Sequence, residues 1–171
     1  KTLKAPTHLK GIGVHSGAPV DLELMPAGIN HGIQFQRTDI DTNNIIDATY
    51  DIVSDTRMST TLTNEHSVSV STVEHLMSAL AGYGITNCLI KVSGPEIPIM
   101  DGSAQDFCNV IQVAGVDNQQ HKKQFIKISQ TIRVESGDSW AELSPSSERT
   151  FTVNFDFSKR LPSALEQSQD I

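Results

Sequence analysis

The sequence predicts an α+β fold, a two-layer sandwich in which an antiparallel sheet packs against helices. Short runs in which polar and apolar residues alternate come first, for example at residues 20–24 and 32–37. Alternation with a period of two is typical of half-buried strands. Helical periodicity begins only afterwards, and strands followed by helices favour an α+β fold over strict α/β alternation.

In the N-terminal part, strands are expected at residues 1–10, 20–24, 32–37 and 88–92. Glycine, proline or polar residues close these runs, as is typical of turns. A polar turn at Asn64-Glu65 lies between two further runs, which predicts a hairpin formed by residues 60–63 and 68–70.

Two later segments have the periodicity of amphipathic helices. The apolar stripe of the first helix has the spacing i, i+3, i+4, i+7, and its members are Val73, Leu76, Met77 and Leu80. Gly82 and Gly84 offer stop signals after it. A second helix is predicted over residues 103–116, with Ser103 as its N-cap residue.

Composition excludes several classes of protein. The chain has 171 residues, of which 37% are hydrophobic and 19% charged, which suits a buried core and not a disordered polyelectrolyte. The net charge of −7 argues against a binder of nucleic acid or anionic membranes. No apolar run approaches the roughly 18–20 residues of a membrane span, so we expect no transmembrane segment. Because the chain begins at Lys1 without a methionine, we expect a fragment.

A polar stretch at residues 117–123 is the expected linker between two domains. The first domain is predicted to span residues 1–120, and residues 121–171 the linker and the opening strands of a truncated second domain. The strands predicted there are residues 125–128, 132–134, 140–143 and 151–155. A weak similarity between residues 16–26 and 136–145 fits a true repeat and chance equally well.

The most informative segment for function is Ser71-Thr72-Val73-Glu74-His75-Leu76. One interpretation is structural: Ser71 and Glu74 have capping-box spacing, so Glu74 would only cap the helix. The other interpretation is chemical, because a histidine that binds metal beside a carboxylate that accepts a proton from metal-bound water is typical of hydrolytic zinc sites. Both stay open at this point, since one histidine is not a metal site.

The helical wheel separates His75 from the predicted core. At about 100° per residue, His75 points about 150° away from the centre of the apolar stripe. The small residues expected on its side of the helix are Ser71, Ser78, Ala79 and Gly82. A face of small residues around one histidine predicts that something else approaches this face closely.

Two further motifs each allow a structural or a functional interpretation. In residues 94–104, Asp101 precedes Gly102 at a tight turn, and its carboxylate either shapes the loop or orients a neighbouring ligand. In the glycine-rich run 11–17, His15 either belongs to a plain hairpin or contacts a substrate. This run lacks the GxGxxG spacing and the following helix of a dinucleotide-binding loop.

These three motifs, at residues 11–17, 71–76 and 95–104, occur together, in order and at family-like spacing. With them the chain resembles the bacterial UDP-3-O-acyl-N-acetylglucosamine deacetylase family, zinc hydrolases (amidohydrolases) of lipid A and lipopolysaccharide biosynthesis. The resemblance covers nearly the whole chain, including residues 137–142. It implies two similar α+β domains with the active site between them, a zinc cofactor, a UDP-sugar substrate and a cytoplasmic location in a Gram-negative bacterium.

The resemblance also implies roles for individual residues. His75 matches the first zinc ligand, and Glu74 matches the general base that activates the zinc-bound water. Asp101 is similar to a residue that supports the site. The substrate-binding residues that the resemblance implies, near the sugar, diphosphate and acyl chain, are His15, Met58 and Thr61.

The chain departs from the family pattern in one large respect. The family's other two zinc ligands belong to a His-x-x-x-Asp motif late in the second domain, and no such segment is present here. The first hypothesis is therefore the N-terminal portion of a zinc-dependent deacetylase, inactive by itself, whose partner is the remainder of its own second domain. The alternative is a non-catalytic α+β domain that binds a ligand or partner through the same face.

Overall fold

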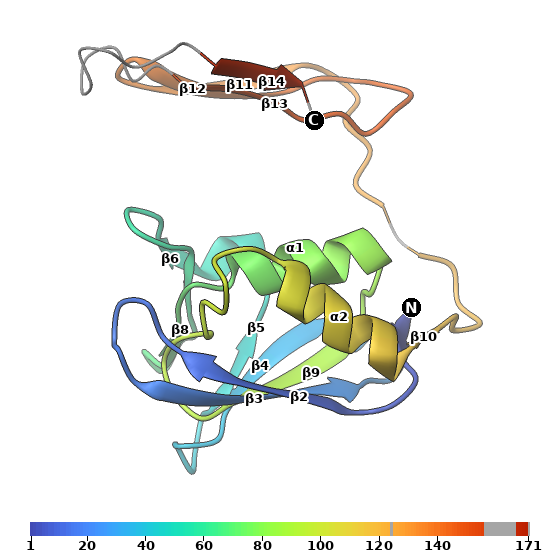
Figure 1. The fold of residues 1–171 in the computed structure, drawn as a ribbon. Helices are drawn as coiled ribbons and strands as arrows, with labels where there is room; N and C mark the ends of the chain where they lie inside the picture. The colour runs from blue at the N-terminus through green and yellow to red at the C-terminus, as the bar shows by residue number, and fades with distance from the viewer. Residues whose placement is uncertain (124, 156–166, 171) are drawn as a thin grey trace. The chain divides into compact units, whose positions relative to one another are not determined.

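A computed structural model describes residues 1–123, 125–155 and 167–170 of the chain. The chain divides into two compact units, Lys1–His121 and Lys122–Ile171 (Figure 1). All three sequence motifs lie in the first unit. In the described part of the chain, no helix has the length and apolar character needed to cross a membrane.

The first unit is built on a five-stranded sheet with the strand order β2-β3-β9-β4-β5. In that order the strands are β2 (Thr7–Ile12), β3 (Pro19–Pro26), β9 (Cys88–Val92), β4 (Ile33–Arg37) and β5 (Ile45–Asp47). Neighbouring strands are antiparallel except β4 and β9, which are parallel. Parallel neighbours need a crossover connection, and here the crossover contains the first helix.

A smaller three-stranded sheet has the order β6-β7-β8. Its strands are β6 (Val53–Asp55), β7 (Thr61–Thr63) and β8 (Ser69–Val70), and a 3-10 turn, η1 (Tyr50–Ile52), precedes it. The predicted hairpin is confirmed, since Leu62 pairs with Val70. The Asn64 side chain shapes its turn, because Asn64 Oδ1 accepts hydrogen bonds from the backbone N–H groups of His66 and Val68.

Two helices, α1 (Glu74–Tyr83) and α2 (Gln105–Ala114), cover one face of the five-stranded sheet (Figure 1). Their apolar stripes and the facing strands form one core, whose largest fully buried members include Phe35, Leu22, Leu24, Leu76, Leu80, Phe107 and Ile111. Burial of each such side chain is worth roughly 1.5–3 kcal/mol. β1 (Thr2–Leu3) pairs with β10 (Val116–Asp117) beyond α2. This arrangement confirms the predicted α+β sandwich.

The helix ends differ in part from the predictions. α1 ends as expected, because Gly84 adopts a left-handed φ of 69° and its N–H bonds to the carbonyl of Ala81. At the start of α1, the N-cap position is Val73 and Ser71 Oγ donates to the carbonyl of Pro95 instead. The capping-box interpretation of Ser71 and Glu74 is therefore wrong.

Two further helix predictions need correction. α2 begins at Gln105, later than predicted, although Ser103 Oγ still accepts a hydrogen bond of 3.1 Å from the Gln105 N–H. Ala79, which we expected on the same side of α1 as His75, is buried in the core. The apolar face of α1 is thus wider than the stripe that the sequence indicated.

The described residues of the second unit form two antiparallel strand pairs. β11 (Ile132–Ser136) pairs with β12 (Ser139–Leu143), and β13 (Thr152–Phe155) pairs with β14 (Gln167–Asp170). β11, β12 and β13 confirm the strands predicted there, whereas β14 was not predicted. The strand predicted at residues 125–128 does not form. Every residue of β11 and β12 is exposed, so this hairpin encloses no core of its own.

Candidate active site

The two candidate catalytic side chains are adjacent at the start of α1. Glu74 is the first residue of the helix and His75 is the second. Glu74 Oε2 accepts a hydrogen bond of 3.1 Å from the backbone N–H of Thr60. Because Thr60 directly precedes β7, this bond holds the carboxylate beside the start of that strand. Both side chains are half-buried whereas Leu76 is fully buried, so His75 lies outside the core, as the helical wheel predicts.

The same contact brings Met58 and Thr61 to the edge of the site. Thr60 also accepts a hydrogen bond of 3.4 Å from the backbone N–H of Val73, so this segment is bound to the helix start at two points. Thr61 opens β7 and is half-buried, and Met58 lies in the preceding turn with 81% of its side chain exposed. An exposed methionine two residues before Thr60, which bonds to Glu74, is compatible with an apolar part of a substrate.

A buried carboxylate, Glu96, joins the other two motifs. Only 2% of Glu96 is exposed. Its Oε1 accepts a hydrogen bond of 2.9 Å from the backbone N–H of His15, and its Oε2 accepts one of 2.9 Å from the backbone N–H of Ser16. Oε1 also accepts a longer bond of 3.4 Å from the hydroxyl of Thr72, two residues before Glu74.

The hydrogen bonds to Glu96 also determine its charge. Burial by itself would raise the pKa of the Glu96 carboxyl, because it penalises the charged form. The hydrogen bonds from Ser16 and His15 outweigh burial and lower the pKa below its ordinary value. Glu96 is therefore a carboxylate at neutral pH, with its charge directed at the glycine-rich loop.

Glycine is required where this loop meets Glu96. A Cβ added to Gly13 would overlap Glu96 Oε2 and Ser16 Oγ, and a Cβ added to Gly11 would overlap the side chains of Pro98 and Met100. The loop is also held by the backbone, since the Ile99 N–H bonds to the carbonyl of Ile12 at 3.0 Å. The glycine-rich run is thus a close packing surface for residues 95–100, and it presents the exposed His15 side chain.

The segment that enters α1 is held in an unusual backbone conformation. Thr72 is buried and has a φ of 58°, which is rare for a β-branched residue and costs on the order of 1–3 kcal/mol. Two backbone hydrogen bonds fix Ser71, the residue before it. The Ser71 N–H donates to the carbonyl of Pro95, and the Ile97 N–H donates to the carbonyl of Ser71. This tightly held turn places Glu74 and His75 at the surface.

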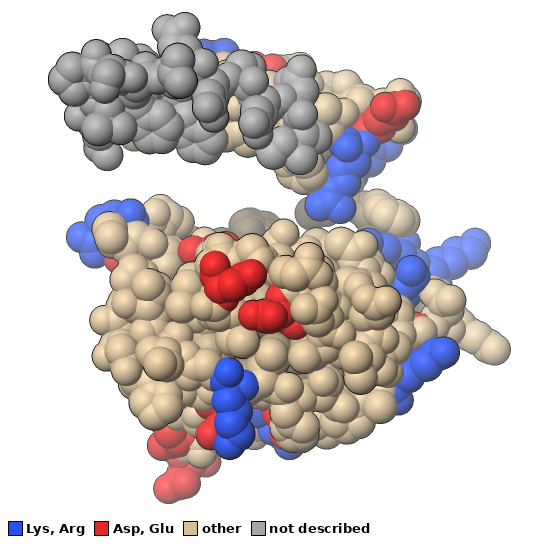
Figure 2. Space-filling view, viewed as in Figure 1, with Lys and Arg blue, Asp and Glu red and all other residues tan. Residues whose placement is uncertain are grey.

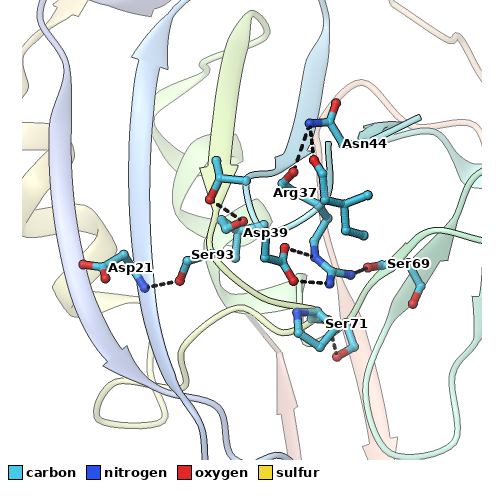
Figure 3. A network of polar contacts seen from close by, with 11 residues as sticks. Asp21, Arg37, Asp39, Asn44, Ser69, Ser71 and Ser93 are labelled. Atoms are coloured by element: carbon cyan, nitrogen blue, oxygen red, sulfur yellow. Dashed lines mark hydrogen bonds and ion pairs between the residues drawn. The ribbon is translucent and has the colours of Figure 1, made fainter. Parts of the chain in front are cut away.

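A second anchor lies just upstream, where Arg37 holds β8 (Figure 3). The buried Arg37 guanidinium donates two hydrogen bonds to the Asp39 carboxylate and one of 2.7 Å to the carbonyl of Ser69. Asn44 Nδ2 donates to the carbonyls of Arg37 and Ile40, which fixes the turn after β4. The hydrogen bond from Arg37 lowers the pKa of Asp39. The strand leading to the site is therefore tied to the main sheet.

Asp101 lies close enough to His75 for the two side chains to interact electrostatically. Asp101 Oδ1 accepts hydrogen bonds of 2.8 Å from both the backbone N–H and the hydroxyl of Ser103. These bonds lower the pKa of Asp101, and the charge of His75 contributes in the same direction. The carboxylate thus shapes the loop before α2 and lies within electrostatic range of His75.

The surface around the start of α2 carries little charge apart from a small acidic group (Figure 2). A shallow cavity of about 420 Å³ opens there, lined by Gly11, Ile12, Ile99, Met100, Asp101 and Asp106. Its walls come from the glycine-rich run, from the loop before α2 and from the first turn of α2. The cavity therefore lies between two of the three sequence motifs.

The side chains near His75 are of the types that bind zinc, but the described part of the chain offers too few of them for a complete site. A half-buried imidazole with a carboxylate nearby is a typical ligand arrangement, and catalytic zinc takes about three protein ligands. Within the described residues, no group of three or more His, Cys, Asp or Glu side chains is placed to hold a metal ion. The described chain alone does not complete a zinc site, so His75 fits zinc only as one ligand of a larger set.

Glu96, Thr72 and Arg37 were not identified from the sequence. Glu96 lies in a motif that we interpreted through Asp101, and its two partners in the glycine-rich loop are about 80 positions away along the chain. One signal was present, because a glutamate enclosed by Pro95 and the apolar residues 97–100 is typical of a buried carboxylate. Nothing in the sequence identified its partners.

The fold and the site define an α+β domain that presents a carboxylate and an imidazole from consecutive residues at one helix start. The chain belongs to the family described as UDP-3-O-acyl N-acetylglycosamine deacetylase (LpxC), whose model matches residues 1–171.

Relatives of the same name agree with this assignment. The chain is 45% identical over 169 residues to the UDP-3-O-acyl-N-acetylglucosamine deacetylase of Shewanella denitrificans, covering 99% of this chain and 55% of the relative. It is 49% identical over 158 residues to that of Methylococcus capsulatus, covering 91% and 52%. It is 44% identical over 171 residues to that of Idiomarina loihiensis, covering 100% and 55%. The chain therefore spans about half the length of these relatives.

Proposed function

We propose that this chain supplies the N-terminal half of a zinc-dependent deacetylase that removes the N-acetyl group from UDP-3-O-acyl-N-acetylglucosamine in lipid A biosynthesis. The proposal includes the cytoplasmic location that the family implies. The observation that carries it is the placement of Glu74 and His75 as consecutive, half-buried residues at the start of α1, in a chain of this family.

In the proposed reaction, Glu74 is the general base. Its carboxylate accepts a proton from a water molecule, whose oxygen forms a bond to the acetyl carbonyl carbon. The C–N bond then breaks as the leaving nitrogen takes up a proton, which balances the one removed from water, and the products are acetate and a free 2-amino group on the sugar. The Thr60 N–H, 3.1 Å from Glu74 Oε2, orients the carboxylate for this role.

His75 would supply one zinc ligand, and the remaining ligands would come from the rest of the protein. Bound zinc lowers the pKa of a coordinated water and polarises the carbonyl of the substrate. Asp101 would support His75 through the charge interaction between them. His15, Met58 and Thr61 would contact the substrate from the two loops that flank the helix start.

The decisive experiment uses the full-length protein that contains this chain. Glu74→Gln is expected to lower kcat for deacetylation by roughly 10²–10⁴-fold with a much smaller change in KM, because a general base contributes to the transition state and not to ground-state binding. Glu65→Gln is the matched control, since Glu65 lies in the exposed turn between β7 and β8. A Glu74→Gln rate equal to that of the control would overturn the proposal.

A second measurement separates this function from a non-catalytic binding domain. Zinc titration of the 171-residue chain is expected to show binding weaker than micromolar, because a single imidazole leaves most of the coordination shell to water. The full-length protein is expected to bind zinc far more tightly and to lose this binding in His75→Ala. Full-length protein that binds the UDP-sugar, but binds no zinc and releases no acetate from it, would identify a binding domain instead.

A further inference from the structure

We propose that Glu96 is a positioning residue of this site: one buried carboxylate fixes the loop that carries His15 and the turn that presents Glu74 and His75. The inference rests on the proposed function and deepens it. Glu96 does not face the reacting groups itself; it acts through Ser16, through the backbone of His15 and through Thr72.

The contacts of Glu96 distinguish it from an ordinary core residue. Each carboxylate oxygen accepts a backbone N–H of the glycine-rich loop at 2.9 Å, and both N–H groups lie in the turn beyond the last pair of the β2–β3 ladder, Ile12 with Pro19. Bonds from N–H groups to an ionised carboxylate are among the stronger hydrogen bonds in proteins. Two internal backbone hydrogen bonds close the loop, from the Gly13 N–H to the carbonyl of Ala18 and from the Gly17 N–H to the carbonyl of Gly13. The bonds to Glu96 then fix the N–H groups of His15 and Ser16 inside this turn.

The third contact couples the loop to the helix. Thr72 is held at a φ of 58° and donates its hydroxyl to the same Oε1 atom that binds the His15 N–H. Its backbone neighbours, Ser71 and Val73, are bonded to Pro95 and Thr60. The carboxylate therefore links the glycine-rich loop to the turn before α1, so that a displacement of one also displaces the other.

Charge supports the same role. A neutral side chain of equal size would keep the packing at this position, yet it would present an NH₂ group to one of the loop N–H groups. Two donors would then face each other in a buried place, which breaks the hydrogen bond and leaves a polar group unsatisfied. The carboxylate is thus needed for its acceptors, beyond its volume.

The first test measures hydrogen exchange in the full-length protein carrying Glu96→Gln. Exchange is expected to accelerate about tenfold or more in two peptides at once, one covering residues 11–17 and one covering residues 71–77, while the strand at residues 88–92 stays protected. Glu23→Gln is the matched control, because Glu23 is a partly buried glutamate of the same domain that pairs with Lys91 outside the site. Acceleration in neither peptide, or in only one, would overturn the coupling.

The second test measures kinetics as a function of pH. Misplacement of a reacting group by about 1 Å costs roughly 10²-fold in rate, so Glu96→Gln is expected to lower kcat by about 10–100-fold with little change in KM. The pH values at which activity rises and falls are expected to stay as in the unmodified protein, because Glu96 positions the base and does not replace it. An acidic limb that moves in Glu96→Gln would assign a direct proton-transfer role and overturn the positioning role.

If Glu96→Gln folds poorly, the variant Thr72→Val still tests the positioning role of Glu96. Valine has the same shape as threonine and the same backbone preference, but it lacks the hydroxyl. This variant is expected to lower kcat, to leave exchange at residues 11–17 unchanged, and to add little to the loss in Glu96→Gln when the two are combined. Full additivity of the two losses would show that Glu96 does not act through Thr72.

The failure of this inference can be distinguished from failure of the proposed function. Unmodified full-length protein that hydrolyses no N-acetyl substrate would overturn the proposed function. The exchange of residues 11–17 and 71–77 would still decide whether Glu96 holds the loop and the helix start together. Normal activity with unaltered exchange in Glu96→Gln would overturn the inference and leave the function intact.

Discussion

The first unit and the second unit differ in where their apolar side chains lie. In Lys1–His121, the sheet and both helices bury a continuous core that includes Phe35 and Phe107. In the described strands of the second unit, Trp140, Val134 and Leu143 are each at least half exposed. Hydrogen-bonded strand pairs form in both units, but among the residues that the structure describes only those of the first unit bury their apolar side chains in a core.

Strand pairing and core formation are thus separate requirements. A two-stranded hairpin is marginally stable in water unless an apolar face is packed against something else. Local patterning is sufficient to form β11 and β12. The stability of this hairpin, however, depends on an apolar surface of another part of the protein that packs against it.

The largest effect is expected for Phe107→Ala in the core of the first unit. Phe107 is fully buried on α2, and removal of a buried phenylalanine side chain destabilises a domain by about 3–5 kcal/mol. Val113→Ala on the same helix is the control, because Val113 is 87% exposed and is expected to change the free energy of unfolding by less than about 0.5 kcal/mol. Urea unfolding followed by circular dichroism measures both, and equal effects would contradict the assigned core.

A smaller loss is expected for Gly13→Ala at the junction between the loop and Glu96. The added methyl group would overlap Glu96 Oε2 and Ser16 Oγ, and overpacking of this kind costs about 1–3 kcal/mol. Gly28→Ala is the control, because a Cβ there meets nothing and glycine-to-alanine changes at such positions are neutral or slightly stabilising. The test is the urea midpoint of each variant, and a Gly13→Ala midpoint equal to that of Gly28→Ala would mean that the loop is not packed on Glu96.

A still smaller, pH-dependent effect is expected from Glu96. Its pKa is lowered in the folded state, so the stability it contributes is present above the unfolded value of about 4.5 and is lost as the pH falls through the folded pKa. The difference in free energy of unfolding between the unmodified chain and Glu96→Gln is therefore expected to shrink as the pH is lowered below about 4.5. Urea midpoints measured from neutral to acidic pH test this, and a difference that stays constant would contradict it.

The smallest effect is expected in the second unit. Trp140 is the one tryptophan of the chain and is 53% exposed, with the Arg133 guanidinium 4.2 Å from its ring centre. In the 171-residue chain, its fluorescence is expected to be red-shifted already and to change little across the unfolding transition that circular dichroism reports. Blue-shifted emission that moves at the same urea concentration would show that the second unit is packed.

The sequence predicted the features that depend on near neighbours. The hairpin ending at Val70, the apolar stripe of α1 and its end at Gly84 follow from alternation, spacing and one glycine, and the structure confirms them. The strand expected at residues 125–128 does not form, because alternation indicates an apolar face but not a neighbouring strand that pairs with it.

Features that depend on distant partners were not predictable in the same way. The parallel pairing of β4 with β9 requires knowledge of the whole crossover between them. Glu74 and His75 were identified because chemistry limits which residue types do acid–base and metal work. Glu96, Thr72 and Arg37 were missed because what they do is set by groups that only the folded chain brings to them.

The hydrogen bond between Glu96 and the His15 N–H joins positions 81 apart in the chain, and this separation has a consequence for synthesis. A polypeptide that leaves the ribosome from its N-terminus exposes the glycine-rich loop long before Glu96 emerges. During that interval the loop has no acceptor, and β3 has no β9 to pair with. Closing so long a connection is entropically costly, so the site is assembled late, after most of the first unit has been translated.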